Sequence, residues 1–500
     1  MKRRDFMRNS MIAGALAWVP PNLLASSPLP GNTTEEVGPD LEDTQARAAR
    51  KYAAYVHGTR FDDFPPDVRE KAKYLILDCV GCALGATQTQ EGQANIKLSK
   101  VLQGRPESTV IGGGMQNSPW TSAFVNTQLA NMLDFDDTWD VYPPGHPGCL
   151  IVPAALAVGE SVHASGREIL TAVVLGYEIA MRVGHALGSL LWLTGFPLLP
   201  DQIGPAVVTN RLLGADEATV ERSFGVLALD FGPRAQLAFQ KYDVPSSMDL
   251  GTLKANMGGA TELGMLAGYK AKSGLSGMPG LLDLDYTGWC MEGLLPQGYG
   301  DLTRGLGREH WILKMSFKPT PSCRWTHVPI TAAWSALGNR PVRAAEIDRV
   351  IVKGVNRLER YQWERMLQAQ FSNPCALALA MTGETPGPGW YTSGRFRDAD
   401  IRELASKVRL ERDPEAEVRE INDLGMTCNV EITFKTGEVK SARCEHVKGA
   451  PGNPMSGDEL VAKFKTNASH LKPGLQQQIL ETILHLETVS DIASLMGILG

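Results

Sequence analysis

Two short stretches of this chain concentrate side chains that can move protons and bind anions. The first stretch spans residues 134–140 and holds four aspartates, and it is followed by His146 before Pro147. The second stretch spans residues 318–327 and holds two cations, a thiol and an imidazole. A carboxylate beside an imidazole makes a proton-transfer pair, and a nearby lysine stabilises negative charge on a substrate. Lys254, before a glycine-rich segment, is a third and more isolated feature.

Both stretches allow other interpretations at the level of residue types. Cys323 and His327 are four residues apart, so on a helix they would meet as nucleophile and base. Carboxylate oxygens also suit a hard cation, although the spacing of the calcium-loop motif is absent. The aspartates are also typical of a solvated helix end, and a histidine before a proline is typical of a turn.

Several common site motifs are absent from the sequence. There is no HExxH zinc motif and no Walker A loop, and Gly112-Gly113-Gly114 lacks the GxGxxG spacing. In residues 274–277 the second glycine comes one place too early for a GxSxG nucleophile turn. The net charge is -6 and no face carries clustered Lys and Arg, which argues against nucleic-acid binding.

Helical patterns dominate the elements that must position these stretches. Pro65-Pro66 opens a helix whose apolar residues, from Val68 to Val80, recur at helical spacing. Capping boxes at Ser165–Glu168 and Ser456–Glu459 start two further predicted helices. Glycines at 258, 264 and 268 indicate a helix that packs closely on its neighbours.

Strand patterns begin only after about residue 308. Residues 349–353 and 429–434 read as strands, and Thr436-Gly437 turns the chain into a return strand that begins at Val439. Two helices are predicted between these strands, at residues 357–381 and 398–408.

The predicted fold is mainly α, with a large all-helical domain built from both chain ends and an inserted α+β lid. The predicted parts are a signal peptide at 1–27, a linker at 28–44, the helical domain at 45–308 and 456–500, and the lid at 309–455. Ligand sites favour clefts between domains, and a movable lid can exclude water.

The N-terminus has the pattern of an export signal. Lys2-Arg3-Arg4-Asp5-Phe6 resembles a twin-arginine motif, and the apolar residues 11–24 lead to the small residues Ala25-Ser26-Ser27. The apolar run is shorter than the roughly 20 residues that span a bilayer. We therefore predict a periplasmic protein that meets the twin-arginine export machinery. Such a protein folds before export, so its eight cysteines are not expected to form disulfides.

Several motifs, in order along the chain, resemble those of the MmgE/PrpD family. Asp134–Thr138 followed by His146-Pro147 is similar to the signature of that family. The further matching stretches are 72–81, 153–157, 176–178 with Arg182, 318–323 with His327, 369–372 and 449–454. The resemblance covers about residues 45–500.

The resemblance implies a lyase without cofactor or metal that acts on a small carboxylate. The family includes 2-methylcitrate dehydratase, cis-aconitate decarboxylase and iminodisuccinate epimerase. Its fold is the helical domain with an inserted lid, usually as a homodimer.

The resemblance also implies roles for matched residues. The expected catalytic residues are Asp134, His146, Lys318 and Cys323, and the expected substrate-binding residues are Thr138, Asp137, Lys254, Arg324 and His327. In this hypothesis His146 transfers a proton and is oriented by Asp134, while Lys318 binds the substrate carboxylate. Cys323 is the acid or base on the opposite face.

Two positions depart from the family pattern. Pro197 stands where family members that handle tricarboxylates have a histidine, and Asn256 stands where the family has a second one. The neighbouring Leu198 and Leu199 predict a more apolar wall. An isomerase or epimerase, a hydrolase, and an exported binding protein without turnover are therefore alternative functions.

Overall fold

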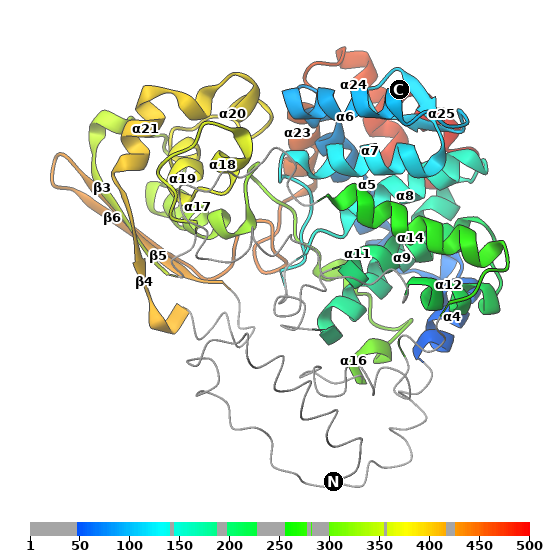
Figure 1. Cartoon of the computed structure of the whole chain (residues 1–500). Helices are drawn as coiled ribbons and strands as arrows, with labels where there is room; N and C mark the ends of the chain where they lie inside the picture. Colours follow the sequence, from blue (N-terminus) through cyan, green and yellow to red (C-terminus); the bar gives the residue numbers. More distant parts are fainter. Residues whose placement is uncertain are drawn as a thin grey trace, which may run out of the picture. The chain divides into compact units, whose positions relative to one another are not determined.

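Helices make up most of the structure, a computed structural model (Figure 1) that describes residues 48–140, 145–187, 198–227, 256–277, 282, 300–354, 358–416 and 426–500. The prediction of a mainly α protein is confirmed. The predicted signal peptide and linker and Lys254 lie outside the described residues.

The first part of the chain is helical, and the acidic stretch lies between two of its helices. Its described helices are α4 (Ala48–Gly58), α5 (Pro66–Ala86), α6 (Gln90–Val101), α7 (Pro119–Met132), α8 (Gly148–Ser161), α9 (Gly166–Leu187), α11 (Leu198–Leu212), α12 (Glu217–Leu227) and α14 (Met257–Lys272). Short helical turns lie at η1 (Phe61–Asp63), α16 (Gly300–Thr303) and η2 (Trp311–Lys314).

Local signals start these helices where the sequence predicts. Helix α5 begins at Pro66, and its apolar face from Val68 to Val80 is buried. Helix α9 follows the predicted capping box, in which the Ser165 N–H donates to the Glu168 carboxylate at 2.7 Å. Among the described helices, α9 is long and apolar enough to cross a membrane, but 94% of its apolar window is buried, as in a core helix.

Helix α14 packs directly on the backbones of α7 and α11. A Cβ on Gly258 would lie 2.6 Å from the Phe124 carbonyl oxygen, and one on Gly264 would lie 2.2 Å from that of Gln202. Only glycine permits such close approach at these two positions, so the predicted packing role of these glycines is confirmed.

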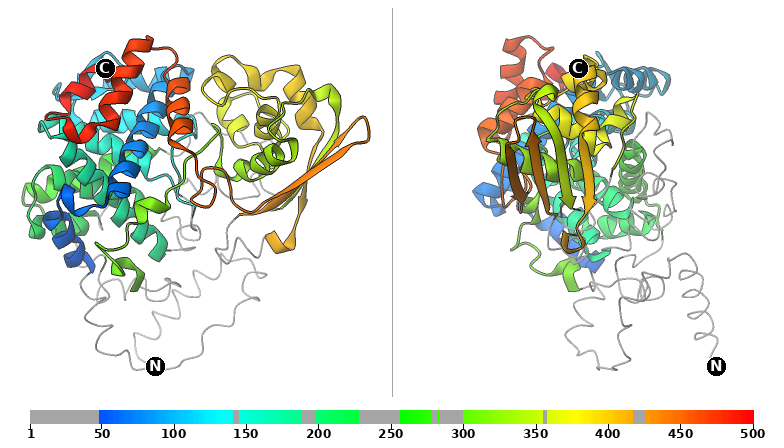
Figure 2. Two further views of the ribbon diagram at one scale, coloured as in Figure 1. Left: turned by 180° about the vertical axis from the view of Figure 1, so that it is seen from behind. Right: turned by 90° about the vertical axis from the view of Figure 1, so that its left-hand side faces the viewer.

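Helices from both ends of the described chain lie side by side (Figures 1 and 2). The C-terminal elements are α23 (Gly457–Asn467), α24 (Pro473–Leu484), η5 (Leu486–Thr488) and α25 (Ala493–Leu499). Helix α23 starts at the predicted capping box of Ser456 and Glu459, and both α23 and α24 pack against α5.

The remaining part of the chain contains a four-stranded sheet in the order β4-β3-β5-β6. Its elements are α17 (Arg324–Leu337), η3 (Ala344–Glu346), β3 (Ile347–Gly354), α18 (Met366–Gln370), α19 (Asn373–Met381), α20 (Gly389–Thr392), η4 (Arg395–Arg397), α21 (Ala399–Ser406), β4 (Val408–Arg412), β5 (Cys428–Phe434) and β6 (Val439–Cys444). Strand β3 pairs parallel with β4 and antiparallel with β5. Helix α17 packs on β5 and β6 (Figure 1).

The predicted hairpin is confirmed, whereas two helix predictions were wrong in extent. Strands β5 and β6 join at Thr436-Gly437, where Gly437 has a φ of 86°. The predicted helix 357–381 is divided into α18 and α19, because Pro374 opens a new helix and cannot continue the previous one. The predicted helix 398–408 ends at Ser406, and Val408 begins β4.

A second, two-stranded sheet was not predicted. It pairs β1 (Ser108–Val110) with β2 (Met115–Asn117) around the glycines at 112–114. Contacts join residues 44–500 into one unit, so the predicted domain boundaries at 308 and 455 stay predictions.

Candidate active site

The acidic stretch forms the loop that leaves the C-terminal end of α7. Asp134 has a φ of 50°, in the left-handed region that aspartate tolerates better than most residues. Its N–H donates to the Asn131 carbonyl at 2.9 Å. The Asn131 side-chain amide donates to both oxygens of Asp136, at 3.1 Å each. The turn therefore fixes two carboxylates, those of Asp134 and Asp136, close to one another.

His146 lies between these two carboxylates. Its Nε2 is 3.7 Å from Asp134 Oδ1, and its Nδ1 is 3.2 Å from Asp136 Oδ2. The His146 side chain is 18% exposed, whereas both aspartates are buried. Two carboxylates fix the direction of the ring and stabilise the imidazolium form. The structure thus brings His146 and Asp134 together and adds Asp136.

Lys318 reaches the same loop from the second stretch. Its side chain is fully buried, and its ammonium donates to the Asp134 carbonyl at 2.9 Å and pairs with the Asp134 carboxylate. Antiparallel backbone bonds of 2.9 Å between Thr138 and Ser316 hold the two stretches together. The sequence-predicted carboxylate, imidazole and ammonium therefore form one cluster.

Asp137 and Thr138 are bonded to other parts of the protein. The Tyr177 hydroxyl donates to Asp137 at 3.0 Å, and burial together with the charge of Asp136 raises the pKa of Asp137 well above its usual value. The Thr138 hydroxyl donates to the Gly145 carbonyl at 3.1 Å. Both side chains are buried. A substrate contact for either residue stays a prediction, and their described contacts hold the loop.

Cys323 and Arg324 lie at the start of α17. The Cys323 N–H donates to the Gln370 carbonyl at 3.0 Å, and the residue is 9% exposed. Arg324 donates to both oxygens of Asp140, at 2.8 and 2.5 Å. Such a bidentate pair is among the strong charge-assisted contacts, so the Arg324 guanidinium is already neutralised within the protein. Its predicted contact with substrate stays a prediction.

His327 lies inside α17 and is wholly buried. Its Nε2 is 3.0 Å from the Ser322 carbonyl, so this nitrogen carries the hydrogen. Burial, followed by the charges of Arg324 and Lys318, holds the pKa of His327 well below its usual value. The hydrolase interpretation, with His327 as base for Cys323, gains no support from this geometry.

Several residues that hold the cluster were given no role from the sequence, although Asp78, Asp140 and Tyr177 lie in stretches that the motifs singled out. They are Asp78, Asn131, Asp140, Tyr177, Ser316 and Lys463. Asp136 could have been assigned from sequence, because it lies two residues after Asp134 in the same acidic stretch. Of the departures, Pro197 lies outside the described residues, and Asn256 precedes α14 with a φ of 46°.

One group within the described residues also has the spacing of a cation site. Asp134, Asp136 and His146 each offer a ligand atom, and these atoms all lie within 4.8 Å of one another. The Lys318 ammonium already pairs with Asp134, so a positive charge is supplied at this position by the chain itself. The predicted absence of a metal stays a prediction.

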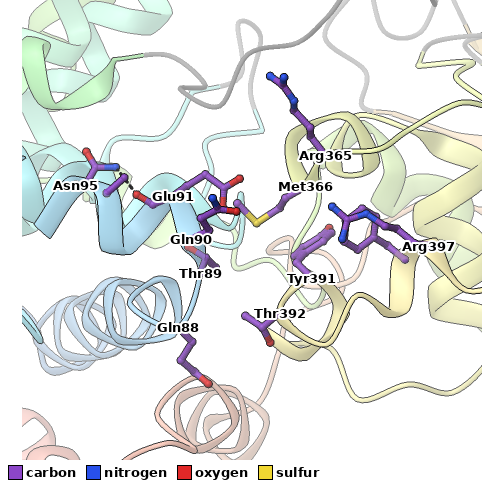
Figure 3. Close-up of a pocket in the computed structure, with 12 residues that line it drawn as sticks. Gln88, Thr89, Gln90, Glu91, Asn95, Arg365, Met366, Tyr391, Thr392 and Arg397 are labelled. Atoms are coloured by element: carbon purple, nitrogen blue, oxygen red, sulfur yellow. Dashed lines mark hydrogen bonds between the residues drawn. The ribbon is translucent and has the colours of Figure 1, made fainter. Parts of the chain in front are cut away.

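A cavity of about 670 Å³ is lined by residues other than those of this cluster (Figure 3). Its lining residues are Gln88, Thr89, Gln90, Glu91, Ala94, Asn95, Arg365, Met366, Tyr391, Thr392, Phe396 and Arg397. None of the described residues predicted for the site lines it. The Tyr391 hydroxyl donates to the Pro321 carbonyl, so it is engaged in holding the backbone of the second stretch.

Comparison with known proteins agrees with the motifs. The model of the MmgE/PrpD N-terminal domain matches residues 50–291, and that of the MmgE/PrpD C-terminal domain matches residues 320–488. The chain is 25% identical to the cis-aconitate decarboxylase of Homo sapiens, over 90% of this chain and 93% of that protein. It is 24% identical to the cis-aconitate decarboxylase of Aspergillus terreus, over 88% of this chain and 93% of that protein. This chain belongs to the MmgE/PrpD family.

Proposed function

We propose that this protein is a lyase that removes water or CO2 from a small carboxylate, at a bond next to the carboxylate group. The observation that supports the proposal is the buried cluster in which Lys318 pairs with Asp134 beside His146. Relatives named cis-aconitate decarboxylase favour the same class of reaction.

Both reactions build negative charge on the substrate. In an elimination, a base removes the proton next to the carboxylate, and its bonding electrons form the double bond as hydroxide leaves with a proton as water. In a decarboxylation, the electrons of the broken C–C bond stay on the substrate carbon, which then takes a proton. Each reaction needs a proton-transfer group and a cation in a site that excludes water.

Lys318 supplies the cation in this proposal. An ammonium has three hydrogens, and the two contacts of Lys318 with Asp134 use two of them. The third is the donor that we assign to the substrate carboxylate. Because the Lys318 side chain is fully buried, its interaction with a developing enolate is stronger than it would be in water.

His146 is the proton-transfer group. Asp134 and Asp136 stabilise its imidazolium form, which suits it to deliver a proton to the leaving group or to the substrate carbon. Cys323, at the start of α17, is the residue that we assign to the opposite face of the substrate. The proposal requires neither metal nor cofactor.

The test is turnover by the purified mature protein after dialysis against a chelator. Products from 2-methylcitrate, cis-aconitate and smaller hydroxy- and unsaturated carboxylates would be followed by NMR. We expect loss of water or CO2 from at least one substrate, and a rate at least about 10²-fold lower for Lys318→Ala because the charge of the transition state loses its cation.

Lys407→Ala is the matched control for this experiment. Lys407 likewise donates to a backbone carbonyl and a carboxylate, those of Ala344 and Glu403, but it lies outside the cluster. Its variant should keep the wild-type rate. Turnover that needs an added divalent metal would contradict the metal-free mechanism, and no turnover of any substrate would contradict the lyase proposal. Solvent deuterium entering a substrate that loses no group would instead identify an epimerase.

A further inference from the structure

Lys463, in the C-terminal helix α23, is a buried cation that contacts the acidic loop. Its side chain is 4% exposed. The ammonium donates to the Phe135 carbonyl at 2.6 Å and lies 4.0 Å from the centre of the Phe135 ring. Nothing in the sequence of α23 distinguishes this lysine from those on a solvated face.

The same ammonium pairs with a buried carboxylate on α5. Lys463 Nζ is 2.5 Å from Asp78 Oδ1, and the Asp78 side chain is 1% exposed. Burial raises the pKa of Asp78, and the charge of Lys463 opposes that rise. The lysine therefore has two separable roles: it neutralises Asp78, and it holds the Phe135 carbonyl.

The packing of α23 on α5 fixes where this ammonium lies. A Cβ on Gly81 would lie 3.2 Å from the Phe464 ring, so the two helices are in close contact beside the lysine. The Gln88 side chain also donates to the Asn467 carbonyl at 3.0 Å. A lysine on so constrained a helix presents its donor from a fixed direction.

The Phe135 carbonyl lies between the two carboxylates that contact His146. Each residue from 134 to 138 is held by a different partner: Asp134 by Lys318, Phe135 by Lys463, Asp136 by Asn131, Asp137 by Tyr177 and Thr138 by Ser316. The Lys463 contact holds the carbonyl of the peptide group that joins residues 135 and 136. Rotation of this peptide would swing the Asp136 carboxylate away from His146.

We propose that Lys463 is a positioning residue of the active site, which sets the direction of the Asp134 and Asp136 carboxylates by holding the carbonyl between them. The role of these carboxylates in turnover rests on the function proposed above. The placement of His146 does not, so it can be measured without a substrate.

The experiment compares Lys463→Met with the double variant Asp78→Asn/Lys463→Met. The single variant leaves the buried Asp78 carboxyl group without its cation, and it is expected to lose stability. The double variant removes both charges, so we expect it to fold with nearly wild-type stability while still lacking the bond to Phe135. If Lys463 positions the loop, kcat of the double variant stays about 10- to 100-fold low while KM changes by less than about 3-fold.

Lys73→Met is the matched control. Lys73 lies on α5, as Asp78 does, and joins this helix to the C-terminal part of the chain through Glu487 at 3.1 Å, outside the contacts described for the loop. We expect wild-type kcat for this variant. Recovery of wild-type kcat together with stability in the double variant would show that Lys463 only balances the charge of Asp78, and would overturn the proposal.

A readout independent of activity separates this proposal from the proposed function. The His146 ring signals would be assigned by comparing NMR spectra of the wild type and His146→Gln. In the folded double variant we expect these signals to be displaced or broadened, because the ring loses its fixed partner. His146 signals identical to those of the wild type would overturn the positioning role, whether or not any substrate is turned over.

Discussion

At the scale of residues, the cluster combines one partly exposed imidazole, which can take up and release a proton, with charged side chains that are buried. His146 is the most exposed member, at 18%, while Lys318 and the carboxylates beside it are buried. A partly exposed imidazole can exchange protons with solvent and substrate. Buried charges, by contrast, cannot reorient toward water, so their field on the substrate is preorganised.

Removing the imidazole tests whether His146 is the group that transfers the proton. In His146→Ala we expect kcat to fall by roughly 10²–10⁴, the usual contribution of a proton-transfer group, measured with the best substrate of the panel. The control is His163→Ala, because His163 also pairs with a carboxylate, Asp491 at 2.9 Å, but its side chain is 75% exposed at another site. An unchanged kcat in His146→Ala would show that another group moves the proton.

The residues of the cluster were predictable to different degrees. Asp134, His146 and Lys318 stand in stretches where several reactive side chains crowd together, and such crowding is visible in a single sequence. The partner of Arg324 was not visible, because Asp140 lies in the other stretch and only the fold brings the two together. Lys463 lies within an ordinary amphipathic helix, two residues before Lys465, and carries no local signal at all.

At the scale of elements, helix α9 holds the segment that leads to Lys318. Glu178 accepts a hydrogen bond from the Ile312 N–H at 3.0 Å, and Arg182 donates to the carbonyls of Arg304 and Glu309 at 2.5 and 3.0 Å. Both α9 side chains are fully buried and pair with one another at 3.6 Å. The helix thus holds the segment through hydrogen bonds to its backbone.

This arrangement predicts a pH-dependent stability. Burial raises the pKa of Glu178 from 4.5 to about 7. The protonated form is favoured in the folded state, so its stabilising contribution is present below about pH 4.5 and is lost as the pH rises through 7. Glu178→Gln removes this titration. Measured by urea unfolding, its stability relative to the wild type should rise between pH 5 and pH 8, by up to about 3 kcal/mol.

Glu481→Gln, at an exposed position of α24, is the control for this series. Its stability relative to the wild type should be the same at both pH values. A Glu178→Gln difference that does not change with pH would mean that Glu178 is ionised across the whole range, with Arg182 compensating its burial.

Local signals predicted most elements and missed those that depend on distant partners. The capping boxes at Ser165 and Ser456 and the turn at Gly437 act within a few residues, so they were readable. Strands β1 and β2 are three residues each, too short to show a period. Strand β4 follows α21 after a single residue and pairs with β3 in parallel, a pairing that no local pattern specifies.

At the scale of the whole molecule, the two family models match residues 50–291 and 320–488, which is most of the described chain. Neither model covers the N-terminal residues. The homodimer, the periplasmic location and the export signal stay predictions. An exported lyase would meet substrates outside the cytoplasm.

The export prediction can be tested in a bacterium that has the twin-arginine pathway. We expect the full chain to reach the periplasm and to lose about residues 1–27, seen by mass spectrometry of its N-terminus. Replacing Arg3 and Arg4 together by lysine should leave the precursor in the cytoplasm, whereas Arg8→Lys should not. Cytoplasmic accumulation of the unprocessed wild-type chain would contradict the prediction.

The contact between Lys463 and Phe135 also bears on biosynthesis. The two residues are 328 positions apart, so α23 leaves the ribosome long after the acidic loop. Until then the acidic loop has neither this cation nor the helix that carries it. A chain released before residue 457 would contain the whole of the loop and Lys318, yet we expect it to be inert. The activity of this protein would then arise only after α23 has been translated, and removal of that helix would silence it without touching a reacting group.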